Sequence, residues 1–110
     1  MTKGRSAGTS IPKGCPLDRV FRLLAGEWTT HILWVLSHNG TTRHGELRRL
    51  VDGISSKVLT DRLRMLEKEG IVFRDYEPTV PPKVSYGLTD AGKELDGALR
   101  AMQNVADHWN

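Results

Sequence analysis

The stretch RHGELRRLVDGISSKVLTDRLRMLEKE, residues 43–69, decides the fold that the sequence predicts. Its first part has apolar residues at helical spacing, namely Leu47, Leu50 and Val51. Its second part has a similar apolar face, formed by Val58, Leu59, Leu63 and Leu66. Two amphipathic helices joined by a few residues that include a glycine form the helix-turn-helix pattern.

The residues between the two predicted helices suit a tight turn. Gly53 tolerates a positive φ angle, and Ile54 is a candidate for packing between the helices. Ser55 is a favourable N-cap, because its hydroxyl can accept a hydrogen bond from the first turn of a helix. We therefore expect the second helix of the pair to begin next to Ser55.

The second helix has an outward face of polar side chains that can hydrogen-bond to the base edges and phosphates of DNA. An ordinary pair of surface helices would also turn polar side chains to water, so this stretch alone leaves both interpretations open. Together with flanking residues and the wing described next, the candidate DNA-binding residues are Arg43, Ser55, Ser56, Lys57, Thr60, Asp61, Arg64 and Lys83.

A β-hairpin is predicted after the helix pair. Residues 71–77 are rich in β-branched and aromatic side chains, and Val84, Tyr86 and Leu88 alternate with Lys83, Ser85 and Gly87. Segment 78–82 contains three prolines, which cannot join a ladder, so we expect a loop there. A helix-turn-helix followed by a hairpin is the winged-helix arrangement. Lys83 is suited to reach phosphate or the minor groove, although an exposed loop lysine is by default only solvated.

Two helices are predicted before the helix pair, and a short strand at residues 41–42 follows them. Pro16 suits the first position of a helix whose apolar stripe comprises Leu17, Val20, Phe21 and Leu24. Residues 27–37 form the next helix, with one apolar face made of Trp28, Ile32, Val35 and Leu36. Because Leu33 and Trp34 lie off that face, this helix is central in the core or also contacts a partner.

The last predicted helix starts at Thr89, a favourable N-cap, and carries a short heptad seam. Leu95, Met102 and Trp109 recur every seven residues along it. The seam is suited either to cover the core or to pair with a second copy, and we favour a dimer because the domain already has core helices. The predicted dimer-interface residues are Leu17, Phe21, Trp34, Leu95, Met102 and Trp109.

Cys15 is the only cysteine and precedes the first predicted helix. A thiol at a helix N-terminus feels the positive end of the helix dipole, which favours the reactive thiolate. Cys15 is therefore a candidate redox-sensing residue, while a small inert residue under the start of the helix is an equal alternative. A single cysteine forms no intrachain disulfide, which fits a reducing cytoplasm.

Composition limits the classes of protein to consider. The chain has 110 residues, 38% hydrophobic and 26% charged, which suits one globular domain at residues 15–110 behind a mobile tail at residues 1–14. No apolar run is long enough to span a membrane. The net charge is +3, and residues 41–64 alone hold six basic and three acidic side chains. This distribution is compatible with a nucleic-acid partner.

Enzymatic and metal-binding motifs are lacking in the sequence. It contains no G-x-S-x-G, no H-E-x-x-H and no P-loop. Its histidines, His31, His38, His44 and His108, fall at no metal-ligand spacing. We therefore expect neither an enzyme nor a metal or other cofactor.

The motifs in their order resemble the HxlR family of winged-helix bacterial transcription regulators. The resemblance rests on CPLDRV at 15–20, GEWTTHILWVL at 26–36 and the stretch at 43–67, and it continues through EGIVFR, the wing YEPTVPPKVSY and LTDAGKEL. It covers residues 15 to about 109. Two residues depart from the family pattern: Glu27 stands where Lys or Arg is common, and His44 where an aromatic residue is common.

The resemblance implies a mainly α fold with a small β-wing, flanked by N- and C-terminal dimerisation helices. It implies a homodimer that binds a palindromic operator in double-stranded DNA, and we expect a repressor in the bacterial cytoplasm. Relatives that sense oxidants or electrophiles use a cysteine placed like Cys15, so such an effector is an expectation here too. The alternatives are a winged helix used for protein–protein contact, and a regulator with a non-covalent small-molecule effector.

Overall fold

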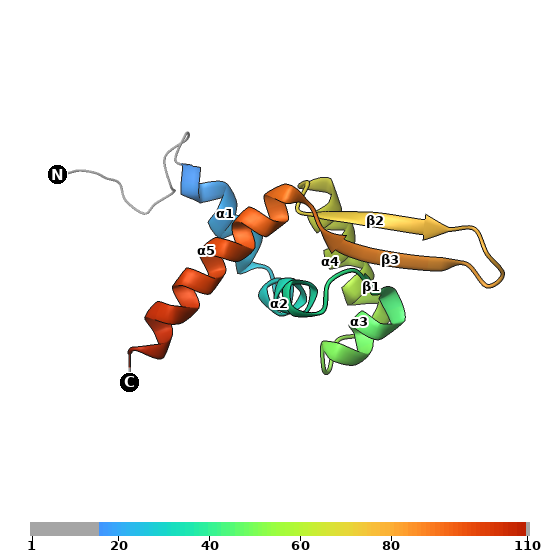
Figure 1. Ribbon diagram of the computed structural model, residues 1–110, viewed down its shortest axis with the longest axis horizontal. Helices are drawn as coiled ribbons and strands as arrows, with labels where there is room; N and C mark the ends of the chain where they lie inside the picture. Colours follow the sequence, from blue (N-terminus) through green and yellow to red (C-terminus); the bar gives the residue numbers. More distant parts are fainter. Residues whose placement is uncertain (1–15, 110) are drawn as a thin grey trace.

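The computed structural model describes residues 16–109. Its helices are α1 (Pro16–Ala25), α2 (Thr29–Asn39), α3 (His44–Leu50), α4 (Ser56–Lys68) and α5 (Asp90–Asp107). Its strands are β1 (Thr42–Arg43), β2 (Val72–Glu77) and β3 (Lys83–Leu88). The prediction of a mainly helical fold with a small β-wing is confirmed (Figure 1). The predicted tail at residues 1–14 and Cys15 lie outside the described residues.

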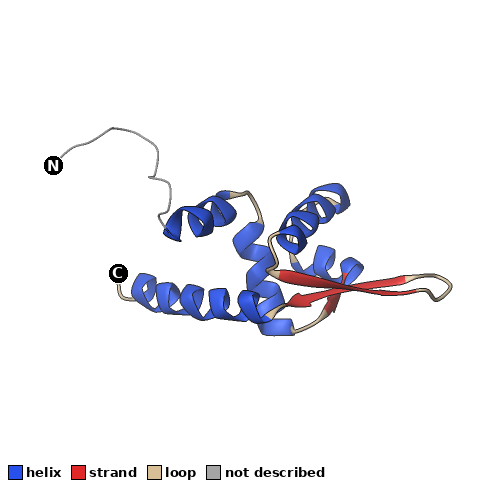
Figure 2. Ribbon diagram, turned by 90° about the horizontal axis from the view of Figure 1, so that it is seen from above, coloured by secondary structure: helices blue, strands red, loops and turns tan. Residues whose placement is uncertain are grey.

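The sheet is antiparallel and has the order β1-β3-β2. The register of the wing runs from Val72 opposite Leu88 to Glu77 opposite Lys83, and the proline-containing segment 78–82 closes its tip. Thr42 of β1 pairs with Tyr86 of β3, so β1 joins the wing to the start of the helix pair. The wing and α5 extend to opposite sides of the molecule (Figures 1 and 2).

The hydrophobic core lies between α2, the helix pair and the base of the wing. Helix α2 buries three apolar residues, which confirms that this helix is central. The sheet contributes Tyr86 to the core, and α1 contributes Leu23. The core residues are Leu23, Ile32, Leu33, Leu36, Leu47, Val51, Ile54, Leu59, Leu63, Leu66, Val72 and Tyr86.

The start of α2 and the exposure of Leu50 differ from the sequence predictions. The second helix begins at Thr29 and not at residue 27, because Trp28 has a φ of 73° and its carbonyl accepts the N–H of Ile32 as the helix starts. Leu50, predicted on a buried face, is 37% exposed. Helix α3 ends at Leu50, and the non-helical Val51 that follows turns into the core in its place.

Only part of the apolar stripe predicted for α1 faces the core. Leu17 and Phe21 are exposed, while Leu23, which lies outside that stripe, is the buried residue of the helix. Leu24 packs partly against the core. Helix α1 therefore contacts the domain along one edge and leaves an apolar face uncovered.

Helix α5 is anchored to the domain at its N-terminal end. The hydroxyl of Thr89 accepts the N–H of Gly92 at 3.1 Å, as the predicted cap requires, and donates to the carbonyl of Gly70 at 2.6 Å. Leu95 and Leu99 pack partly against the core.

None of the described helices has the length and apolar character needed to cross a membrane.

Candidate nucleic-acid interface

The turn between α3 and α4 fixes the direction of α4. Gly53 has a φ of 91°, a conformation that favours glycine. Ile54 is buried between the two helices, and its N–H donates to the carbonyl of Val51. Ser55 Oγ accepts the N–H of Val58 at 3.1 Å and caps α4 as predicted. The local sequence therefore gives α4 a rigid start.

Helix α4 has one buried and one exposed face. Leu59, Leu63 and Leu66 are fully buried. The candidate residues Ser55, Ser56, Lys57, Asp61 and Arg64 are all exposed, so the fold brings them together on one side of the helix. Arg62, a further basic residue of α4, is bound elsewhere, because its Nε donates to the carbonyl of Glu27 at 2.8 Å.

Thr60 differs from the other candidate residues because it is half-buried and already has a hydrogen-bond partner. Its Oγ1 lies 2.9 Å from Nε2 of His44, the first residue of α3. Burial lowers the pKa of His44 below its ordinary 6.5, and the charge of Arg48 lowers this pKa further. The sequence did not predict this contact, although the departure of His44 from the family pattern singles out the position.

A cavity of about 720 Å³ lies between α4 and the wing. Arg64 of α4 and Arg74 of β2 line it together with Glu67 of α4, so two basic side chains and one acidic side chain face this cavity. The Arg74 guanidinium also lies 5.4 Å from the centre of the Tyr76 ring. Arg74 was missed in the sequence because its strand was predicted only from its β-branched and aromatic residues. The lining residues are His44, Thr60, Arg64, Glu67, Arg74, Val84 and Tyr86.

The two remaining DNA-binding candidates lie away from α4. Arg43 is exposed in β1, pairs with Ser85 of β3 and directly precedes α3. Lys83 is half-exposed at the start of β3, opposite Glu77 and next to the tip of the wing. The wing extends away from the helices, and Lys83 lies at its outer end (Figure 1). Lys83 and α4 would therefore contact different parts of a bound molecule.

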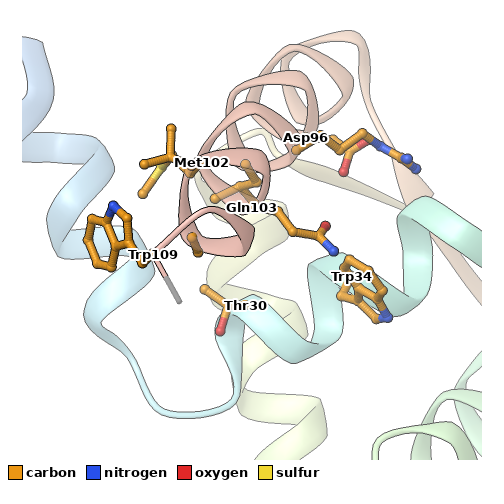
Figure 3. Close-up of a pocket in the computed structure, with 10 residues that line it drawn as sticks. Thr30, Trp34, Asp96, Met102, Gln103 and Trp109 are labelled. Carbon is orange, nitrogen blue, oxygen red and sulfur yellow. The ribbon is translucent and has the colours of Figure 1, made fainter.

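A groove of about 560 Å³ lies between α2 and α5, on a different part of the domain (Figure 3). Trp34 of α2 and Met102 of α5 line it, and both are exposed. Among the other predicted interface residues, Leu95 packs partly on the core, and Trp109 is exposed but lies beyond the end of α5 at Asp107. The seven-residue seam therefore has only its middle member, Met102, on an exposed stretch of the helix.

No group of His, Cys, Asp or Glu side chains suited to hold a metal ion is present within residues 16–109. The candidate redox residue Cys15 falls outside that range.

The model of the family described as HxlR-like helix-turn-helix matches residues 23–110. The chain belongs to this family. The HTH-type transcriptional regulator sll1512 of Synechocystis sp. is 41% identical to the chain over 95 residues, which cover 86% of the chain and 70% of the relative. This HxlR-like protein is therefore a transcriptional regulator and not an enzyme, as the sequence predicted.

Three solved structures of two proteins illustrate the fold of the HxlR-like chain. A transcriptional regulator of the MarR family from Porphyromonas gingivalis W83 superposes with a TM-score of 0.81 at 29% identity, covering 93% of this chain and 99% of the other. The reduced form of the transcriptional regulator YodB from B. subtilis gives a TM-score of 0.76 at 38% identity, covering 86% and 93%. A diamide-treated form of YodB, at 36% identity, gives a TM-score of 0.74 and covers 89% and 97%.

Proposed function

We propose that this HxlR-like regulator binds a palindromic operator in duplex DNA as a homodimer and represses transcription. The observation that carries the proposal is the exposed polar face of α4, which the capped turn after α3 holds clear of the core. A helix presented in this way fits the major groove, which is wide enough to admit an α-helix.

Each side chain on this face has a chemical role in the proposal. Lys57 and Arg64 donate to guanine O6 and N7 or to phosphate oxygens, and Asp61 accepts from cytosine N4. Ser55 and Ser56, at the start of α4, contact the sugar–phosphate backbone together with the positive end of the helix dipole. Arg43, Lys83 and Arg74 contact phosphates or the minor groove on either side of α4.

The proposed dimer uses the apolar surface left exposed on α1, α2 and α5. Leu17, Phe21, Trp34 and Met102 are exposed there, and aromatic and Met side chains are enriched at the centres of protein interfaces. A two-fold dimer would present two α4 helices roughly 34–36 Å apart, one turn of DNA, which requires a palindromic operator. Such a dimer represses most simply by covering the promoter.

The proposal also includes redox control, in which oxidation of Cys15 changes the activity of the regulator. Cys15 is the only cysteine of the chain, so its reversible products are a sulfenic acid, a mixed adduct or a disulfide to the partner subunit. The support comes from YodB, whose solved structures include a reduced and a diamide-treated form. We infer that the regulator acts in the cytoplasm, where its DNA and a reduced Cys15 would be found.

The test is selection of bound sequences from random duplex DNA, run with reduced and with diamide-treated protein. We expect a palindromic sequence whose affinity falls as salt rises between about 50 and 200 mM. Lys57→Ala or Arg64→Ala should cost about 1–3 kcal/mol of binding free energy if the side chain meets a base, or flatten the salt dependence if it meets a phosphate.

The outcomes separate the parts of the proposal. Absence of salt-sensitive binding to any duplex would reject DNA binding and favour a protein-contact module. Equal responses of wild type and Cys15→Ser to diamide would remove the redox role and leave DNA binding intact.

A further inference from the structure

The hydrogen bond between His44 and Thr60 has two chemically different forms. When Nε2 of neutral His44 carries no proton, it accepts the Thr60 hydroxyl proton, and Oγ1 is left with lone pairs that accept hydrogen bonds. When Nε2 carries a proton, it donates to Oγ1, and the hydroxyl proton is free for another acceptor. The state of His44 therefore decides what Thr60 offers to its surroundings.

The surroundings of His44 favour its neutral ring, whose two tautomers correspond to the two forms of this bond. Burial first, and the charge of Arg48 second, lower the pKa of His44 below 6.5, so the ring is neutral at neutral pH. The Tyr86 ring lies beside it, with the ring centres 6.4 Å apart. The titratable groups that face the same cavity from α4, β2 and β3 are Arg64, Glu67, Arg74 and Tyr86.

We propose that His44 is a positioning residue that sets whether Thr60 presents a donor or an acceptor to the base edge it meets. The inference rests on the proposed function, because it requires α4 to enter the major groove. Thr60 lies on α4 between the exposed Lys57 and Arg64, and its half-buried side chain remains partly accessible. His44, the first residue of α3, is hydrogen-bonded to Thr60 and acts on the base through it.

The two forms match different bases. Thr60 as an acceptor suits the amino groups of cytosine and adenine, whereas Thr60 as a donor suits guanine O6 and N7, adenine N7 or thymine O4. A protonated His44 allows only the donor form, because both ring nitrogens then carry protons. Acidification should therefore change the base preferred at one operator position of each half-site. The added positive charge would, in contrast, strengthen binding to all sequences alike.

The experiment is sequence selection at about pH 5.5 and about pH 7.5 with wild-type protein, Thr60→Val, His44→Phe and His44→Gln. Thr60→Val should lose its base preference at one position of each half-site. At the same position, acid should shift the wild-type preference toward an acceptor-bearing base by roughly two- to tenfold, the range of one hydrogen bond. Neither His44 variant should show this shift, since neither replacement side chain has an imidazole ring to protonate. His31→Gln, at an exposed histidine of α2 outside the proposed interface, is the matched control and should keep the shift.

Two kinds of failure can be distinguished. If the wild type selects no duplex sequence at either pH, the proposed function itself is rejected. If the wild type selects an operator but Thr60→Val changes no position, if the wild-type preference is the same at both pH values, or if a His44 variant retains the shift, the role of His44 is overturned while DNA binding stands. His44→Gln serves in place of His44→Phe should the phenylalanine variant not fold.

Discussion

Helices α4 and α5 both carry apolar side chains at helical spacing, but they bury them to very different extents. Leu59, Leu63 and Leu66 of α4 are each 0% exposed. On α5, Met102 is 56% exposed and Val105 is 54% exposed. The same pattern thus marks a core helix in one region and an uncovered surface in the other. An apolar stripe predicts that something covers it, but not whether the cover comes from the same chain.

The largest expected effect is in the core of the helix pair. Leu63→Ala should lower the free energy of unfolding by about 2–5 kcal/mol, because it leaves a cavity under a fully buried side chain. Met102→Ala, the matched change on α5, should cost much less in a dilute sample, where the proposed dimer dissociates. Urea denaturation of both variants measures the difference. If both variants lost the same free energy of unfolding at low protein concentration, the difference in burial between α4 and α5 would have no effect on stability.

A second prediction compares two glycines of α5, one that packs against the domain and one that faces open space. A Cβ built on Gly92 would lie 2.1 Å from the carbonyl oxygen of Ile71, so Gly92→Ala should lower the free energy of unfolding by about 1–3 kcal/mol. The control is Gly97→Ala on the same helix, where a Cβ would meet nothing within 4 Å. That change should stabilise the protein by about 0.5–1 kcal/mol, the helix preference for Ala over Gly. Thermal denaturation measures both variants. A change in stability of the same sign in both would contradict the prediction.

The third prediction tests what covers the exposed part of α5. Met102→Asp should weaken the proposed dimer by at least about tenfold, because a charge would be buried in an apolar contact. Sedimentation equilibrium measures the dissociation constant. Asn104→Asp adds the same charge on the same helix at an exposed residue outside the groove, and it should have a smaller effect. A wild type that is monomeric at micromolar concentration would remove the dimer from the proposal.

The smallest expected effect concerns the hydrogen bond between His44 of α3 and Thr60 of α4. The folded-state pKa of His44 is lowered from 6.5, so the unfolded chain takes up a proton at a higher pH than the folded chain does. The free energy of unfolding should therefore decrease as pH falls from 6.5 through the folded-state pKa of His44. Urea denaturation across this range measures the slope, and His44→Phe should reduce it. An unchanged slope in that variant would assign the pH dependence to other groups.

Local sequence was enough to predict most of the helix pair and the wing. Gly53, Ser55 and Thr89 each have a local reason for their conformation, a positive φ or a capping hydroxyl, and the structure confirms all three. The strands were also predicted close to their bounds, since prolines and alternating side chains act over a few residues. The candidate DNA-binding residues on α4 followed from the same periodicity that gave its buried face.

Only the tertiary structure decided which faces meet and which side chains touch across the chain. The pairing of β1 with β3, the outward turn of Leu50 and the burial of Leu23 in place of Leu17 and Phe21 all depend on elements distant in sequence. The bond from His44 to Thr60 joins residues 16 apart and has no periodic signal. Periodicity defines the faces of a helix because side-chain directions repeat along the backbone. What lies opposite each face depends on how separate elements pack, and a local pattern does not contain that information.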